Sequence, residues 1–163
     1  MISVSGIRGI VGTGLTPLVA SRYAAFFSAY LPDGPIVLGR DSRPTGPALH
    51  HAVTGALMAM GREVLELGVV PTPTVQLQVE YRHAAGGIAI AASHNPIEWN
   101  ALKLIGPSGR FLTGAEGQSY LALAAGPGPD FPGWNRQGRV VPIADPIGLH
   151  LDLILGLSVV DVP

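Results

Sequence analysis

The sequence predicts an α/β protein with three layers, in which helices cover both faces of a mixed, largely parallel sheet that gains a late antiparallel strand. Short apolar runs that suit buried strands alternate with segments whose apolar residues recur at helical spacing. Turns rich in glycine and proline separate these segments. The length of 163 residues and the hydrophobic content of 47% suit one core, so we expect a single globular domain.

The first two predicted helices have recognisable ends. Thr16 offers a capping hydroxyl and Pro17 follows at the first helical position, so a helix should begin there and stop near residue 32. A second helix is predicted over residues 47–60 from the spacing of its apolar side chains. Gly61 then suits a left-handed helix cap.

Three segments are typical of strands. Residues 35–39 and 87–92 are continuous apolar runs, as in strands that are buried on both faces. Residues 63–67 alternate with period two, and a short third helix is expected from about residue 72 to 83. Strands that are separated by helices favour parallel pairing, because each parallel pair needs a crossover connection.

The later part of the chain predicts a more varied structure. A Gly-Pro-Ser-Gly turn between two apolar runs indicates a hairpin, which would make part of the sheet antiparallel. The expected elements are a hairpin of residues 102–105 and 110–112, a helix over 114–125, a surface connection over 126–138, a short strand at 140–141 and a helix over 145–157.

Three loops are the expected place for a ligand. In α/β sheets of this kind, ligands bind at the carboxyl ends of the strands. The loops of residues 40–46, 68–73 and 93–100 follow predicted strands and carry most of the unusual polar residues.

The charge balance argues against a nucleic-acid or membrane-surface partner. Ten Lys and Arg residues face eleven Asp and Glu residues, giving a net charge of −1, so any anion must be held locally. Lys103 is the only lysine. The absence of cysteine excludes disulfides and thiolate metal sites. Without a signal-peptide pattern or a long apolar run, the chain is expected to be soluble and cytoplasmic.

Ser93 stands at a junction between a strand and a loop, beside His94 and Asn95, with Pro96 stiffening the exit. Its hydroxyl is therefore a candidate nucleophile. The alternative is a turn cap, because Ser and Asn are ordinary turn formers. A serine hydrolase ranks far lower, since the chain lacks a Gly-x-Ser-x-Gly elbow and adjacent Ser and His do not make a catalytic pair.

The longer segment of residues 87–104 resembles the active-serine loop of the α-D-phosphohexomutases. That family carries a phosphoserine in a Thr/Ala-Ser-His-Asn-Pro loop, with a lysine downstream. Three more segments match in the same order: Ser-Gly-Ile-Arg-Gly at residues 5–9, Gly-Arg-Asp-Ser-Arg at 39–43 and Val-Pro-Thr-Pro-Thr at 70–74. Ala92 and Ala101 depart from the family's frequent Thr and Gly, and no Phe-Gly-Thr precedes the first segment.

The resemblance implies a fold like the first domain of phosphoglucomutase. Residues 1–138 would be domain I with the serine loop, and residues 139–163 its end and a linker toward domain II. Family members have four domains, and the magnesium loop Asp-Gly-Asp-x-Asp-Arg of their second domain does not occur here. The remaining mutase domains are therefore expected partners, and this chain alone is expected to be inactive.

The activity that the resemblance implies is intramolecular phosphoryl transfer. Such enzymes interconvert hexose 1-phosphate and hexose 6-phosphate through a phosphoserine and a bisphosphorylated sugar, which also serves as activator. Ser93 would carry the phosphoryl group and bind Mg²⁺ through its phosphate, with the other metal ligands in domain II. A phosphosugar is the implied substrate.

The resemblance also assigns roles to several neighbours of Ser93. Lys103, and Arg8 in a segment whose flanking glycines indicate a loop, would stabilise the transferring phosphate. The alternatives are a lysine that reaches out to solvent and an ordinary surface arginine. His94 would contact the phosphate or hold the loop. The phosphate-binding or loop-positioning candidates are Asn95, Asn100, Arg40 and Arg43, with Asp41 and an arginine forming a brace. The other histidines, His50, His51, His83 and His150, fall on predicted helix surfaces and receive no role.

A competing hypothesis is a free-standing binding or regulatory domain that kept the fold but lost the chemistry. A continuation of the reading frame that encodes Asp-Gly-Asp-x-Asp-Arg would favour the mutase.

Overall fold

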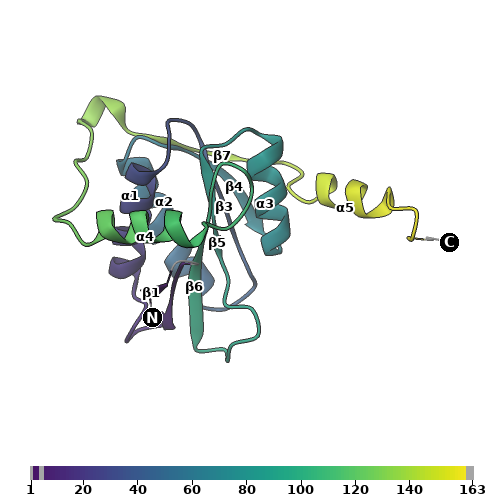
Figure 1. Ribbon diagram of the computed structural model, residues 1–163, viewed down its shortest axis with the longest axis horizontal. Coiled ribbons are helices and arrows are strands. Elements are labelled where there is room, and N and C mark those ends of the chain that lie inside the picture. Colours follow the sequence, from purple (N-terminus) through teal and green to yellow (C-terminus); the bar gives the residue numbers. More distant parts are fainter. Residues whose placement is uncertain (1, 4–5, 161–163) are drawn as a thin grey trace.

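The computed structural model describes residues 2–3 and 6–160, which form one sheet with helices on both faces (Figure 1). The strands lie in the order β1-β2-β6-β5-β3-β4-β7. Their bounds are β1 (Ile2–Ser3), β2 (Gly6–Ile10), β3 (Ile36–Arg40), β4 (Glu63–Val69), β5 (Gly86–Ile90), β6 (Trp99–Ile105) and β7 (Arg139–Pro142). The helices are α1 (Pro17–Tyr30), α2 (Gly46–Ala59), α3 (Thr72–Tyr81), α4 (Gly114–Ala124) and α5 (Gly148–Leu155), with a 3-10 helix, η1 (Trp134–Arg136).

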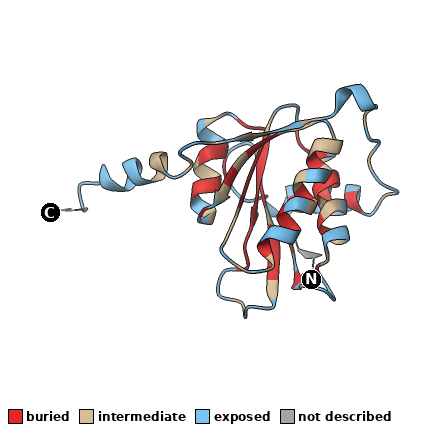
Figure 2. Ribbon diagram, turned by 180° about the vertical axis from the view of Figure 1, so that it is seen from behind, coloured by how far each residue is buried: buried red, intermediate tan, exposed pale blue. Residues whose placement is uncertain are grey.

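Two hydrophobic cores lie on opposite faces of the sheet. The larger core joins α1, α2 and α4 to strand residues such as Ile36 and Leu38. The smaller core packs Val75 and Val79 of α3 against Val37. Successive residues of β3 therefore enter different cores, as alternation along a strand requires. Figure 2 shows the buried residues gathered in the sheet and on the inner sides of the helices, which confirms the predicted three-layer α/β fold.

The antiparallel part of this sheet is larger than the sequence predicted. β3 pairs in parallel with β4 and β5, and β4 with β7. The pairs β1–β2, β2–β6 and β5–β6 are antiparallel. The predicted hairpin is wrong as a two-stranded unit, because Ile105 and Phe111 form only an isolated bridge. Its first segment instead lies within β6, between β2 and β5.

β2 is a strand, although its glycines indicated a loop. It pairs with β6 over its whole length, from Gly6 opposite Lys103 to Ile10 opposite Trp99. Gly6 has φ +131°, and a Cβ there would collide with the carbonyl oxygen of Leu102. This glycine allows the two strands to lie close together. In the sequence, such a glycine cannot be told from one in a loop.

The helix ends are held by side chains and by glycine. Thr16 caps α1, because its Oγ1 accepts a hydrogen bond from the Val19 amide at 3.2 Å. Gly61 follows α2 with φ +81°, as predicted for a left-handed cap. The next residue, Arg62, holds the end of α1 by donating to the backbone carbonyls of Ser28, Leu31, Pro32 and Gly34.

Two of the histidines left without a role have side-chain partners. His50 was expected on a helix surface but is 8% exposed, with Nε2 2.9 Å from Oε1 of Glu66. The stripe of apolar residues on α2 is wide enough to include position 50, between Leu49 and Val53. His150 on α5 lies with Nδ1 2.8 Å from Oγ1 of Thr74.

The last elements extend the sheet and then leave the body of the domain. The strand predicted at residues 140–141 is observed as β7, and it pairs in parallel with β4. In Figure 1, α5 projects away from the sheet on the side of α3, which it contacts through His150 and Thr74, and none of its residues is buried. The boundary predicted after residue 138 stays a prediction. Within the described part of the chain, no helix is long and apolar enough to cross a membrane.

Tyr120 provides a test of how α4 is attached to α1. Its hydroxyl donates to the carbonyl of Tyr23 at 2.9 Å, and its ring contacts Phe27 and Tyr30 edge-on. Tyr120→Phe keeps the ring and removes the hydrogen bond, so we expect the free energy of unfolding to fall by about 1 kcal/mol. Urea denaturation measures this change. Tyr81→Phe, at a side chain that is 63% exposed, is the control, and equal effects of both changes would contradict the account.

Candidate active site

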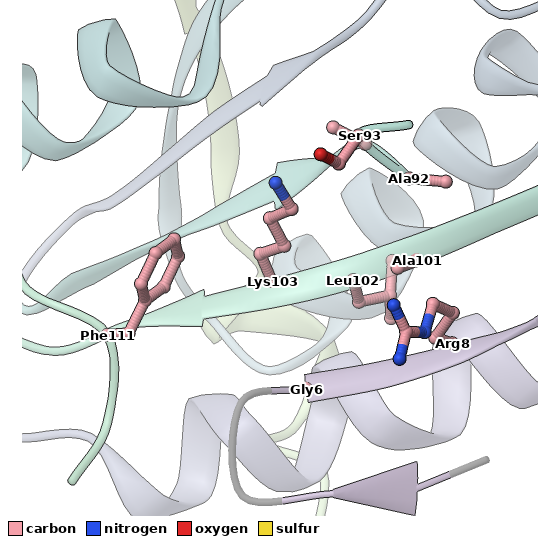
Figure 3. Close-up of a pocket in the computed structure, with 9 residues that line it drawn as sticks. Gly6, Arg8, Ala92, Ser93, Ala101, Leu102, Lys103 and Phe111 are labelled. Carbon is pink, nitrogen blue, oxygen red and sulfur yellow. The ribbon is translucent and has the colours of Figure 1, made fainter. Parts of the chain in front are cut away.

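A cleft at the carboxyl end of β5 brings three of the predicted site residues together. Arg8 comes from β2, Ser93 from the loop after β5 and Lys103 from β6. Figure 3 shows the hydroxyl of Ser93 and the amine of Lys103 pointing into this cleft. The other lining residues are mostly apolar: Gly6, Ala91, Ala92, Ala101, Leu102 and Phe111.

Arg8 reaches the cleft from a strand and not from the loop that was predicted. It pairs with Ala101 across the β2–β6 ladder, so the backbone beneath it is held by the sheet. The cleft thus combines two cationic side chains with one hydroxyl, an arrangement that suits an anion. Ser5, in the same matched segment, lies outside the described residues.

Ser93 has an uncommon backbone conformation. Its φ of +55° falls in the left-handed region of backbone conformation, which residues other than glycine rarely adopt. Holding such a residue costs on the order of 1–3 kcal/mol and requires support from its surroundings. The hydroxyl lies 3.4 Å from Nδ1 of the exposed His94. His94 therefore stands beside the serine, outside the residues that line the cleft.

Arg43 supplies much of that support. Its guanidinium donates to four backbone carbonyls of the segment after β5, those of Ser93 (3.0 Å), Asn95 (2.7 Å), Pro96 (2.7 Å) and Trp99 (3.2 Å). Its Nε donates to Oδ2 of Asp41 at 3.2 Å. A guanidinium has five N–H groups, and these five hydrogen bonds engage all of them.

Asp41 joins Arg43 to the backbone between the end of β5 and Ser93. Oδ1 accepts from the Arg43 amide at 3.1 Å, and Oδ2 accepts from the Ala92 amide at 3.4 Å. The Asp41 amide donates to the carbonyl of Ile90 at 2.9 Å. The carboxylate therefore contacts the residue that directly precedes Ser93.

The two candidate asparagines and Arg40 also contact the surrounding loops. Asn95 donates from Nδ2 to the Ala92 carbonyl at 2.7 Å. Asn100 is fully buried and donates to Oγ1 of Thr45 at 3.1 Å. Arg40 donates to the Asp41 carbonyl at 3.1 Å. These three residues are not among those that line the cleft.

Lys103 is half-buried, and this changes its acidity. Burial lowers the pKa of the Lys103 amine from its ordinary value of 10.5. The nearby charge of Asp41 raises that pKa, and the charge of Arg8 lowers it. Its Nζ donates to Oγ1 of Thr72 at 3.4 Å. Thr72 was missed at the sequence level, although it lies in the matched Val-Pro-Thr-Pro-Thr segment and in an expected ligand loop.

The described residues do not by themselves form a magnesium site. Among residues 2–3 and 6–160, no group of three or more His, Cys, Asp or Glu side chains could hold a metal ion. Mg²⁺ prefers carboxylate and phosphate oxygens, whereas the cleft offers two cations and a hydroxyl.

Comparisons with known proteins agree on one family. The model of the phosphoglucomutase/phosphomannomutase α/β/α domain I matches residues 2–120. A phosphoglucosamine mutase of Synechococcus sp. (strain RCC307) is 48% identical over 118 residues, which is 72% of this chain and 26% of that protein. A phosphoglucosamine mutase of Parasynechococcus marenigrum (strain WH8102) is 38% identical over 151 residues, 92% of this chain and 32% of that protein.

The solved structures agree with the sequence relatives. The crystal structure of a phosphoglucomutase/phosphomannomutase family protein from Burkholderia thailandensis matches with a TM-score of 0.76 and 25% identity, covering 96% of this chain and 36% of that one. The chain therefore spans about a third or less of the length of these relatives.

The lowered pKa of Lys103 is directly measurable, because it is the only lysine. Carbon-13 lysine labelling gives one side-chain NMR signal, and its titration should give a pKa below 10.5. Arg8→Gln should raise that pKa, since the Arg8 charge lowers it, whereas the distant Arg139→Gln should not. The unfolded chain binds this proton more tightly, so the folded domain should gain stability as pH rises from the lowered pKa to 10.5. A pKa of 10.5 or above would contradict the account.

Proposed function

The chain belongs to the phosphoglucomutase/phosphomannomutase family and carries its α/β/α domain I, and we propose from this that it is the serine-bearing domain of a phosphosugar mutase. The observation that carries the proposal is the cleft in which Ser93, Arg8 and Lys103 meet. The curated relatives named above are phosphoglucosamine mutases, which makes a hexose phosphate the proposed class of substrate.

Ser93 is the proposed phosphoryl carrier. In the first transfer, a sugar hydroxyl attacks the phosphorus of phosphoserine, the bond to Oγ breaks and a bisphosphorylated hexose forms. After the sugar turns around, Oγ attacks its other phosphate and takes that group back. The hexose 1-phosphate and hexose 6-phosphate are interconverted in this way, with no net change in the enzyme. The bisphosphorylated hexose also primes Ser93 when it is unphosphorylated, and so acts as activator.

Arg8 and Lys103 have the charge that such a transfer requires. Negative charge spreads over the phosphoryl oxygens during transfer, and cations held in a partly dehydrated site stabilise it strongly. Burial lowers the pKa of Lys103, which makes its amine a better proton carrier near neutral pH than an exposed lysine. In this proposal, Lys103 accepts the proton from the reacting hydroxyl and returns it, and Arg8 binds the phosphoryl oxygens.

The size of the cleft supports a shared site. Its volume is about 150 Å³. Pockets that enclose a whole small-molecule ligand usually measure roughly 300–1,000 Å³, so this cleft suits the phosphoryl group more than the entire sugar. Since the relatives are about three times as long as the matched region, we propose that the remaining mutase domains hold the sugar. The chain alone is then inactive in turnover.

Arg43 and Asp41 are the proposed positioning residues of the serine loop. Because the N–H groups of Arg43 are engaged by carbonyls and by Asp41, it is better suited to hold the loop than to bind phosphate. Asn95, Asn100 and Arg40 take the same role through the contacts described above. His94 lies close enough to Ser93 to contact its phosphate.

Magnesium is assigned to residues outside the described cleft. The family resemblance implies Mg²⁺, with one ligand from the phosphate on Ser93 and the carboxylates from domain II. Among the described residues that line the cleft, none carries a carboxylate that could hold the ion. No step above depends on it.

A phosphate on Ser93 is the direct chemical prediction. Mass spectrometry of the parent enzyme, purified after treatment with a hexose bisphosphate, should locate the phosphate on the peptide that contains Ser93. Ser93→Ala should lose it and should lower the rate of glucose or glucosamine 1-phosphate isomerisation by more than roughly a thousandfold. Ser119→Ala, on the exposed side of α4, should change neither. Undiminished activity in Ser93→Ala would remove the proposal.

Arg43→Lys tests the positioning of the loop in the 163-residue chain. Lysine keeps the charge but loses the planar fork, so it cannot bind four carbonyls at once. The backbone amides of residues 92–95 and 97–99 should exchange hydrogen at least roughly tenfold faster, because the loop opens more easily. Arg22→Lys is the matched control, because Arg22 also binds backbone carbonyls, those of Ala124 and Gly126, far from the loop. Unchanged exchange in the loop would contradict the role of Arg43.

A further inference from the structure

Thr72 contacts the amine of Lys103, although it plays no part in the scheme above. It is the first residue of α3 and follows the carboxyl end of β4, which β3 and β5 separate from β6 in the sheet. Its Oγ1 accepts a hydrogen bond from Nζ at 3.4 Å, across 31 residues of sequence. Within the described part of the chain, this is the side-chain hydrogen bond that the structure records for Lys103.

The turn that carries Thr72 is stiff. Pro71 precedes it and Pro73 follows it, and each proline ring fixes its own φ. The Thr74 amide donates to the Pro71 carbonyl at 3.0 Å. Thr74 is itself fully buried, and its Oγ1 lies 2.8 Å from Nδ1 of His150. The hydroxyl of Thr72 is therefore offered from a fixed position.

Most of the residues that line the cleft around Lys103 are apolar: Ala91, Ala101, Leu102 and Phe111. The polar groups that face it are the Ser93 hydroxyl in the same cleft and the nearby charges of Asp41 and Arg8, but the side-chain hydrogen bond recorded for its amine goes to Thr72. A lysine side chain left without a partner samples many rotamers, and ordering it costs up to about 2 kcal/mol. A hydrogen bond to the Thr72 hydroxyl favours the Lys103 rotamer that places its amine at the cleft.

We propose that Thr72 is a positioning residue, whose hydroxyl holds the Lys103 amine at the cleft beside Ser93. The proposal rests on the proposed function for its catalytic meaning. A hydroxyl suits this role better than a carboxylate. It accepts from the ammonium, and it donates to the neutral amine after the proton has left. A carboxylate would hold the proton on the amine and compete with the phosphate for it.

The single lysine makes the contact measurable without an activity assay. In carbon-13 lysine-labelled protein, an ordered side chain gives two distinct signals for the hydrogens on Cε, whereas a rotating one gives a single averaged signal. Thr72→Val should merge the two signals. It should also lower the pKa of Lys103, because the ammonium loses an acceptor. Thr72→Ser should retain the behaviour of the unchanged protein.

The control is Thr54→Val, which makes the same change at a buried hydroxyl for which the described residues offer no hydrogen-bond partner. It should leave the lysine signal unaltered. If Thr72→Val leaves both the signals and the pKa unaltered, or if Thr72→Ser fails to restore them, the proposal is overturned.

Kinetics of the parent enzyme test the catalytic meaning. Thr72→Val should lower kcat roughly tenfold with little change in KM, because the amine acts in the transfer and not in substrate affinity. Thr72→Ser should restore kcat. If the Lys103 signals respond to Thr72→Val but mass spectrometry finds no phosphate on Ser93 of the treated parent enzyme, the proposed function is overturned and the contact stands. If the Lys103 signals do not respond to Thr72→Val but the treated parent enzyme carries a phosphate on Ser93, the contact alone is overturned.

Discussion

The guanidinium of Arg43 is the constraint on which the candidate site depends. Its hydrogen bonds to four carbonyls gather the segment from Ser93 to Trp99 into one fixed shape, and Asp41 anchors the arginine to the end of β5. A serine at φ +55° is unfavourable alone. The many contacts to this loop offset that cost, so the hydroxyl is presented at the cleft in a set direction.

The sheet places the two cations that meet this serine. Arg8 and Lys103 come from antiparallel neighbours, β2 and β6, so their backbones are fixed by strand pairing and not by loops. Burial lowers the pKa of Lys103, the charge of Asp41 raises it, and the second positive charge at the cleft, Arg8, lowers it. A phosphoryl group offsets the repulsion. The geometry thus suits a site that binds phosphate more strongly than it binds any neutral group.

The sequence allowed much of this structure to be predicted, and the errors have physical causes. Helix caps such as Thr16 and Gly61 act locally, so the helices were found near their true bounds. The direction and partners of β2 and β6 depend on pairing between segments that are far apart in the sequence. The spacing of apolar residues along the chain does not predict such pairing. Matched motifs led to the prediction of Ser93, Lys103 and Arg8 as site residues, and all three line one cleft. Thr72 was missed because its contact with Lys103 exists only after folding.

A phosphate on Ser93 is expected to lie between the cations of the cleft. The most direct test is to titrate the labelled Lys103 before and after Ser93 is phosphorylated. We expect a higher pKa for Lys103 in the phosphorylated protein, because the phosphate's negative charge stabilises the ammonium. A pKa that stays the same after phosphorylation would contradict it.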